Sequence, residues 1–401
     1  MKSIIFLADG MADEPLAELG NKTPLEFANT PNMDWIAKNG AMGSFLTLPD
    51  GLPTSSDVAN MSVLGFLPEE NYPGRGPIEA ISQKIELKSN DVAWRCNIVT
   101  VDPQGVMLDY SAGHIDNEIS RQLIADLQAK FGSDKVSFYP GVSYRNLLVL
   151  HGDEFSKNVD YYKPDSSHGI NEKDLPLTAL SPKAQYTVDF LNKLCAEAAD
   201  FLTNHPLNQG REFPANRIWP WSPGYKPALP AFIDKYQGKK GAIISAVDVI
   251  KGLGIASQMT VIEVEGATGY IDTNYENKAA AALEALKTHD FVYIHVEGID
   301  EVSHLGDLNL KIKAIEDFDK RLVGKVLEGI KGEDFRVIIL PDHPVPIKLR
   351  QHTTTPVPFA IAGNGITVDE VQEYNEKNAA KGSLGLLTKD ELMHFLFFLS
   401  K

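Results

Sequence analysis

Short apolar runs that end abruptly at polar residues recur along the chain, and they predict strands buried on both faces of a parallel sheet. The run VIIL at positions 337–340 is rich in β-branched residues and is followed by Asp342 and His343. The run IIFL at positions 4–7 leads to Asp9 in the same way. Because ligands of open parallel sheets bind beyond the carboxyl ends of the strands, we expect these polar side chains to share one edge.

A third apolar run, FVYIHV at positions 291–296, precedes Asp300 and His304. These two residues are four apart, and on a helical turn that spacing places a carboxylate and an imidazole on one face. His352 lies in the loop that follows the 337–340 run. His295 lies inside its strand, so we expect it to be a buried, hydrogen-bonded histidine rather than a ligand.

Apolar residues at helical spacing predict helices over 121–131, 181–202 and 308–330. Two short helices are expected between 23 and 43, with proline at early helical positions and glycine as the stop signal. The stretch 266–286 changes from a glycine-bearing loop to an alanine-rich helix.

The segment 81–110 differs from its surroundings, because apolar and polar residues alternate along it. A turn at Pro103, Gln104 and Gly105 within it predicts a hairpin, and 136–150 predicts another pair of strands. The Pro- and Trp-rich stretch 216–232 is expected to form a packed loop.

This change of pattern predicts two domains. Residues 83–180 are expected to form a small inserted α+β domain, and residues 1–82 and 181–401 the larger domain that carries the strand-end residues. Further strands of the larger domain are expected at 242–246 and 261–264.

Composition and charge limit the classes of partner. The chain has 401 residues and a formal net charge of −16, which argues against a nucleic-acid-binding protein and favours solubility as the role of the charge. No run approaches the roughly 20 apolar residues of a membrane-spanning helix, and the N-terminal apolar stretch is too short for a signal peptide. Cys96 and Cys195 make no disulfide framework, so we expect a cytoplasmic protein.

The stretch PTSSD at positions 53–57 is predicted to open a helix. Ser55 or Ser56 could therefore be a plain N-cap. The alternative is that one of them is a nucleophile, because backbone N–H groups at the start of a helix stabilise an incoming phosphate. The local pattern leaves both interpretations open.

Together, the strand ends and the loop after the last of them supply three aspartates and three histidines, namely Asp9, Asp300, Asp342, His304, His343 and His352. Six such ligands are enough for two divalent ions. Mixed carboxylate and imidazole donors suit zinc or manganese better than calcium or magnesium alone. Two metal ions roughly 3.5–4 Å apart are a standard arrangement for in-line phosphoryl displacement, so the ligand set predicts a phosphoryl-transfer site.

Several longer motifs contain these residues, in the order FLADGMAD, TPLEFANTPNMD, PTSSDVANMSVLG, GRGPIEA, SAGHI, DVIKGLG, EGATGYIDTNY, HVEGIDEVSHLGD and PDHPVPIKLRQHTTTPVPF. The set resembles the alkaline phosphatase superfamily and, within it, the cofactor-independent phosphoglycerate mutases of the archaeal type. The resemblance covers essentially the whole chain. It implies an α/β fold in which helices flank a mostly parallel sheet, with a smaller inserted α+β domain.

The resemblance also implies roles for individual residues. Ser56 would be the phosphorylated serine. One metal ion would bind Asp9, Ser56, Asp342 and His343, and the other would bind Asp300, His304 and His352. The candidates for binding the substrate's phosphate and carboxylate are Arg75, Arg95, His114, Arg145, His168 and Lys251. Residues of these types in the inserted block are also typical of solvated or ion-paired surface groups.

The activity implied is the interconversion of 3-phosphoglycerate and 2-phosphoglycerate, a step of glycolysis and gluconeogenesis, through a phosphoserine. The cofactors would be two divalent ions, manganese or zinc, with magnesium and cobalt as alternatives. The inserted domain would close over the substrate and keep water from phospho-Ser56. The partner would be a small phosphorylated acid, with neither nucleic acid nor membrane, and the oligomeric state stays open.

Other functions could use the same metal core, namely a homoserine kinase-like phosphotransferase and a metal-dependent hydrolase of phosphate or phosphonate esters. A GxxxxGKS loop is absent from the sequence, which argues weakly against a conventional nucleotide site. The larger bacterial-type mutases carry an Asn-Ser-Glu motif with a following histidine, whereas this chain has Ser55, Ser56 and Asp57. A silent metal-binding protein is a further alternative, and the complete ligand set argues against it.

Overall fold

A computed structural model describes residues 1–399, and the chain divides into two compact units. The first unit combines Met1–Tyr72 with the segment that begins at Leu229, and the second unit is Pro73–Ala228. The second unit thus starts earlier and ends later than the boundaries of 83 and 180 expected from the sequence. Within residues 1–399, no helix combines the length and the apolar character needed to cross a membrane.

Strand pairing explains why the second unit is larger than expected. β9 (Arg217–Gly224) pairs antiparallel with β3 (Val92–Val101), so the chain as far as Gly224 belongs to the same sheet. The prediction of a packed loop over 216–232 is therefore wrong for residues 217–224, which form β9. Pro220 and Pro223 made it look unlike a strand, but β9 pairs only with β3 among the described strands, and proline is tolerated in edge strands.

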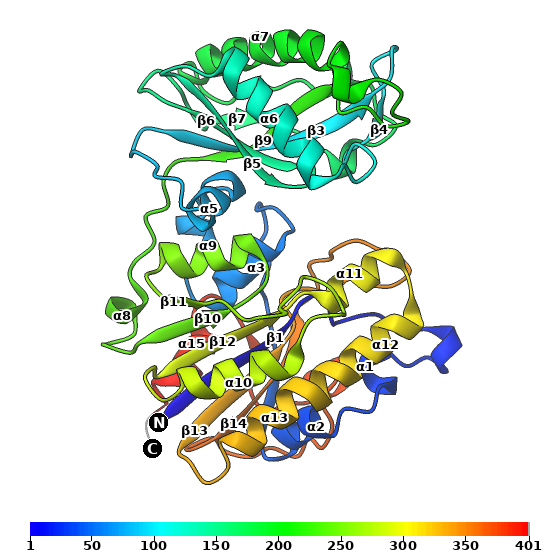
Figure 1. Ribbon diagram of the computed structural model, residues 1–401. Coiled ribbons are helices and arrows are strands. Elements are labelled where there is room, and N and C mark those ends of the chain that lie inside the picture. Colours follow the sequence, from blue (N-terminus) through cyan, green and yellow to red (C-terminus); the bar gives the residue numbers. More distant parts are fainter. Residues whose placement is uncertain (400–401) are drawn as a thin grey trace. The chain divides into compact units, whose positions relative to one another are not determined.

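The first unit is built on an eight-stranded sheet (Figure 1). Its strands are, in spatial order, β11 (Thr260–Ile262), β10 (Gly241–Ile244), β12 (Phe291–Val296), β1 (Lys2–Ala8), β13 (Phe335–Leu340), β14 (Val357–Gly363), β2 (Gly40–Phe45) and β15 (Leu386–Leu387). Among these strands only β14 runs against the others, because it pairs antiparallel with both of its neighbours. The mostly parallel α/β sheet predicted from the sequence is thus confirmed.

The three apolar runs singled out in the sequence form the centre of this sheet. β1 lies between β12 and β13 and pairs in parallel with both. The expected helices between 23 and 43 are also present, as α1 (Pro24–Phe27) and α2 (Pro31–Lys38). Gly40 and Gly43 were predicted only as helix stop signals, but both belong to β2 (Gly40–Phe45), a strand that was not predicted.

Helices cover both faces of the sheet. Side chains of β1 such as Ile4 and Phe6 belong to a buried cluster with residues of the helices on one face, and these helices are α2, α10 (Tyr275–Ala285), α12 (Leu308–Asp317) and α13 (Gly324–Gly329). The opposite face carries α3 (Ser56–Val63), α9 (Asp248–Ala256) and α15 (Glu391–Phe397). There the Phe291 and Phe397 rings meet edge to face at 5.6 Å between centroids.

Shorter elements of the first unit connect these layers: η1 (Ala17–Leu19), α4 (Pro68–Asn71), α8 (Phe232–Lys235), α11 (Gly298–Leu305) and α14 (Glu376–Ala379). α11 directly follows β12, and it carries two of the predicted metal ligands.

The second unit has a five-stranded antiparallel sheet of β3, β4 (Met107–Asp109), β5 (Val136–Val142), β6 (Arg145–Leu150) and β9. On one face Trp94 and Cys96 pack against α6 (Asn117–Phe131) and α7 (Ala184–Thr203). On the other face Ala93 packs against α5 (Arg75–Ser82). The remaining elements are β7 (Val159–Asp160), β8 (Thr178–Ala179), η2 (Asp165–Ser167), η3 (Glu172–Asp174) and η4 (Pro206–Asn208).

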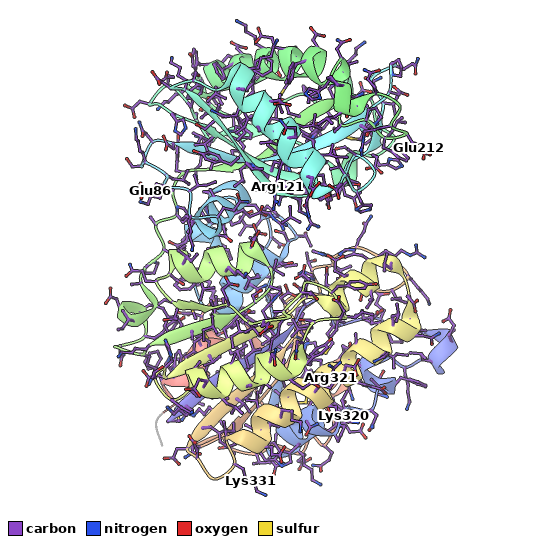
Figure 2. All side chains as sticks on the ribbon, viewed as in Figure 1. Glu86, Arg121, Glu212, Lys320, Arg321 and Lys331 are labelled. Atoms are coloured by element: carbon purple, nitrogen blue, oxygen red, sulfur yellow. The ribbon has the colours of Figure 1, made fainter. Side chains whose placement is uncertain are left out.

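The long helix expected over 308–330 is interrupted by a π-helical segment, η5 (Phe318–Val323), between α12 and α13. Arg321, labelled in Figure 2, projects from η5, and its Nε and Nη2 donate to the Glu276 carboxylate at 2.8 and 2.9 Å. Asp319, on the same segment, is buried, and its Oδ1 accepts hydrogen bonds from Asn32 N at 3.0 Å and Met33 N at 2.7 Å.

Asp319 thus supplies the N-terminal cap of α2, because the N-cap residue Thr30 makes no side-chain cap bond. We predict that Asp319→Ala lowers the free energy of unfolding by about 2 kcal/mol, since it leaves the buried N–H of Met33 and the partly buried N–H of Asn32 without this acceptor. Urea unfolding measures the loss. Thr30→Ala is the matched control and should lose less, and an equal loss in both variants would contradict this capping role.

Candidate active site

The register of the three central strands brings the predicted ligands to one edge of the sheet. Leu7 of β1 pairs with Leu340 of β13, so Asp9 and Asp342, each two residues further on, lie at the same level. At this point Gly10 has a positive φ of 66°, and its N–H donates to Asp342 Oδ1 at 3.2 Å. A Cβ on Gly10 would lie 2.7 Å from the Asp300 Cα, so only glycine fits here.

The first group of candidate metal ligands, called the first ligand group below, consists of Asp9, Asp342 and His343, which are all fully buried. His343 Nε2 lies 3.5 Å from Asp9 Oδ1 and 3.3 Å from Asp342 Oδ2. Ser56 Oγ lies 3.2 Å from the same nitrogen. One serine hydroxyl, two carboxylates and one imidazole therefore converge.

Ser56 is the first residue of α3, and Ser55 is the N-cap residue but makes no side-chain cap bond. Asn60, one turn later, donates from Nδ2 to Ser56 O at 2.8 Å and to Asp342 Oδ2 at 3.0 Å. The Tyr293 hydroxyl donates to Asn60 Oδ1 and fixes the orientation of the amide. The start of α3 is thus tied to the Asp342 carboxylate.

The second group of candidate metal ligands, called the second ligand group below, consists of Asp300, His304 and His352. His304 Nε2 lies 3.3 Å from Asp300 Oδ2, and His352 Nε2 lies 3.4 Å from Asp300 Oδ1. The two Nε2 atoms are 3.0 Å apart, and His304 Nδ1 donates to Arg350 O at 2.9 Å. The two groups adjoin, because the His343 and His352 rings stack with centroids 3.8 Å apart.

The buried charges shift the pKa values of these groups. Burial and the charge of Asp342 raise the pKa of Asp9 well above its usual value. Burial alone would raise the pKa of Asp300, but the imidazoles of His304 and His352 hold it well below the usual range. Burial disfavours protonation of His304, yet Asp300 raises its pKa to about 9. Burial and His352 together lower the pKa of His343.

These residues fit divalent cations. Oδ1 of Asp9 and Oδ1 of Asp300 are buried without a hydrogen-bond partner among the described residues, which is unfavourable unless a cation occupies the space beside them. The Nε2 atoms of three histidines face the same carboxylates. Mixed nitrogen and carboxylate donors of this kind suit zinc or manganese.

In the second unit, three of the predicted substrate-binding residues lie together on the α5 face of the sheet. Arg95 is buried on β3 and pairs with Glu79, and Arg75 Nε donates to the same carboxylate at 2.7 Å. Burial lowers the pKa of Arg95, Glu79 raises it, and the charges of Arg75 and Arg145 lower it further. Glu79 thus pairs with Arg75 and Arg95, and the charge of Arg145 acts on Arg95, so guanidinium groups of the kind that bind anions gather on this face.

The other three predicted residues are more scattered. His114 is exposed, with its ring 6.1 Å from that of Tyr144, over which Arg145 also lies. His168 is exposed at the end of η2. Lys251 belongs to the first unit, on α9, and its Nζ pairs with Glu263 at 2.8 Å.

Known proteins are similar to this chain in sequence and in fold. A family described as 2,3-bisphosphoglycerate-independent phosphoglycerate mutase matches residues 37–208. A protein named 2,3-bisphosphoglycerate-independent phosphoglycerate mutase from Methanosarcina barkeri is 46% identical over 403 residues, which cover 99% of each chain. A probable enzyme of the same name from Geobacter sulfurreducens is 46% identical over 97% of each chain.

The chain belongs to the 2,3-bisphosphoglycerate-independent phosphoglycerate mutase family.

Solved structures agree with this assignment. The cofactor-independent phosphoglycerate mutase of Thermoplasma acidophilum is 29% identical with a TM-score of 0.67, and the alignment covers 100% of both chains. The PH0037 protein of Pyrococcus horikoshii is also 29% identical, with a TM-score of 0.83 over 99% of this chain and 97% of that one. The resemblance to archaeal mutases is confirmed.

Two polar residues of this mutase-family chain extend the site beyond the expected ligands. His295 is fully buried, as expected, with Nε2 3.0 Å from Asp9 Oδ2 and Nδ1 3.1 Å from Ser245 Oγ. Glu297 was not predicted. Burial and the charge of Asp300 raise its pKa to about 8. Its only signal in the sequence was its place between β12 and Asp300.

The raised pKa of His304 predicts that the free energy of unfolding of the metal-free protein depends on pH. In the unfolded chain the pKa is about 6.5, so the stabilisation by protonated His304 is complete below that pH and is lost as the pH rises through about 9. We expect urea unfolding in a chelator to show this loss of stability. Asp300→Asn removes the carboxylate that keeps His304 protonated, so this variant should not show the loss of stability that His304 causes. An unchanged pH dependence in that variant would refute the assignment.

Proposed function

We propose that this protein interconverts 3-phosphoglycerate and 2-phosphoglycerate through a phosphoserine at Ser56. The observation that carries the proposal is the convergence of the Ser56 hydroxyl with two ligand groups at one sheet edge. Full-length relatives that are 46% identical and carry the name of this mutase support the substrate and the reaction. The reaction is a step of glycolysis and gluconeogenesis, and we place it in the cytoplasm.

In this proposal two divalent ions are the cofactors, with manganese or zinc preferred by the donor set and magnesium or cobalt as alternatives. Asp9, Ser56, Asp342 and His343 would hold one ion, and Asp300, His304 and His352 the other. When bound, the ions would supply positive charge against the phosphoryl oxygens and lower the pKa of the serine hydroxyl.

The reaction then consists of two displacements at phosphorus. In the first, Ser56 Oγ forms a bond to phosphorus as the bond from phosphorus to O3 of the substrate breaks, and the serine proton ends on O3. In the second, the 2-hydroxyl oxygen forms the new ester as the bond from Oγ to phosphorus breaks, and its proton returns to Oγ. No further phosphate donor is consumed, which agrees with a family that is independent of 2,3-bisphosphoglycerate.

The chain's own groups prepare Ser56 for this role. Ser56 is the first residue of α3, and the N–H groups in the first turn of a helix have no partner within the helix and favour a negatively charged phosphoryl group. Asn60 holds Ser56 O and the Asp342 carboxylate together, so the nucleophile and a ligand move as one unit.

For the carboxylate of the substrate we propose the arginine cluster of the second unit. Arg75, Arg95 and Arg145 offer planar donor groups that match a carboxylate or a phosphate. Glu79 and the Trp221 ring, whose centroid lies 5.0 Å from the Arg95 Cζ, hold Arg95 in place. His114, His168 and Lys251 are weaker candidates, because the cluster does not include them.

The proposal predicts that Ser56→Ala abolishes phosphoryl transfer, a loss of at least 10³-fold, while the metal content stays near that of the parent. An assay that couples 2-phosphoglycerate formation from 3-phosphoglycerate to a coloured product measures the rate with manganese-loaded protein. Ser55→Ala is the neighbouring control, and it should retain activity because Ser55 contributes no side-chain cap bond.

The same preparation should be tested with homoserine and ATP, and with a simple phosphate monoester. Turnover of either alternative without mutase activity would replace the proposed reaction by a kinase-like or hydrolytic one. Full mutase activity in Ser56→Ala would remove the phosphoserine from the mechanism.

A further inference from the structure

A fully buried lysine contacts the loops that follow β1 and β13, and it has no role in the reaction proposed above. Lys311 is on α12, and its side chain is 0% exposed. Its Nζ donates to Asp13 Oδ2 at 2.8 Å and to Val345 O at 2.9 Å, and it lies 3.4 Å from Ala12 O. The ammonium group therefore has three protein acceptors and no access to solvent.

Asp13, the partner of Lys311, is itself buried and makes further hydrogen bonds. Its Oδ2 accepts from Ile347 N at 3.0 Å, and its Oδ1 accepts from Glu14 N at 2.8 Å. Its own N–H donates to Glu376 Oε1 at 3.0 Å. The ion pair is thus the centre of a buried network of backbone and side-chain groups.

This network joins the three segments that carry the ligands. Asp13 follows Asp9 by four residues on the loop after β1. Val345 and Ile347 follow His343 on the loop after β13. Lys311 belongs to the helix after α11, and its N–H bonds to Asp307 O, directly beyond the turn that ends α11.

Backbone hydrogen bonds continue the connection to the last ligand. Val345 N donates to Ala12 O at 3.2 Å, and Thr353 N donates to Pro344 O at 3.0 Å. Thr353 is the residue after His352. All seven candidate ligands except Ser56 therefore lie on segments that meet at Lys311 and Asp13.

A buried ion pair is an inefficient way to stabilise a fold, since two apolar residues of the same volume are often at least as favourable. Here, however, the ammonium group binds two loops at once through a carboxylate and two carbonyl oxygens, which an apolar side chain cannot do. Outer groups that orient metal ligands typically change metal affinity 10–100-fold when they are removed.

We propose that Lys311 and Asp13 are positioning residues of the two-ion site, which fix the loops after β1 and β13 against α11 and α12 so that the ligand groups have the correct spacing. This inference rests on the proposed two-metal function.

The test compares three variants of the full chain. Lys311→Met removes the ammonium group but keeps a similar side-chain volume. Asp13→Asn/Lys311→Met removes both charges, so that no unpaired charge stays buried. Lys313→Met is the matched control, because Lys313 is on the same helix, its side chain is 64% exposed, and it pairs only with Asp317 among the described contacts.

Each variant is stripped of metal, titrated with cobalt(II) and with manganese(II), and examined by calorimetry and by the visible absorption of cobalt. Urea unfolding of the metal-free protein establishes that the variant is folded. We expect Lys311→Met to bind both ions 10–100-fold more weakly and to have an altered cobalt spectrum. Asp13→Asn/Lys311→Met should regain the free energy of unfolding that Lys311→Met loses, but not the metal affinity. Lys313→Met should match the parent in both quantities.

Parental affinity and an unchanged cobalt spectrum in a destabilised Lys311→Met protein would reduce the pair to a purely structural role and overturn the inference. If Lys311→Met does not fold, the double variant decides, and parental metal binding in it would also overturn the inference. A parent protein that binds no divalent ion would instead overturn the two-metal function itself, so the two failures are distinguishable.

Discussion

Crowding of buried negative charge at one sheet edge is the constraint on which the rest of the site depends. Asp9, Asp300 and Asp342 are nearly or fully excluded from solvent, and Glu297 lies next to them. Buried carboxylates that lie close to one another destabilise a fold unless protons or cations offset their charges. The raised pKa values of Asp9 and Glu297 show the conflict, and the histidines beside Asp300 relieve part of it.

The fold can tolerate this conflict because its centre is strongly stabilised. β1, β12 and β13 are buried on both faces, and helices cover their side chains on either side. Apolar burial of this extent provides the largest favourable contribution to folding. The polar edge therefore lies at the end of three buried, hydrogen-bonded strands, which hold the segments that carry Asp9, Asp300 and Asp342.

The sequence predicted the central strands and the polar residues at their carboxyl ends, because both follow from a simple local pattern, an apolar run that ends in a carboxylate or an imidazole. The role of these residues as metal ligands stays a prediction. The sequence could not predict Asn60, whose role depends on a contact with Asp342, far away in the chain. Lys311 was also missed, since a lysine in an amphipathic helix normally faces solvent. The prolines of β9 concealed a strand, and for that reason the extent of the second unit was underestimated.

The contact between Gly10 and Asp300 has a consequence for attempts to change the chemistry of such a site. Two ligand-bearing segments touch there through main-chain atoms, with no intervening side chain that could be lengthened or shortened. The separation of the two ligand groups is thus built into the scaffold, whereas the donor atoms are not. To accommodate ions of a different radius, a designer would have to change the side-chain rotamers or the types of donor atom, because the main-chain positions of the two groups are fixed.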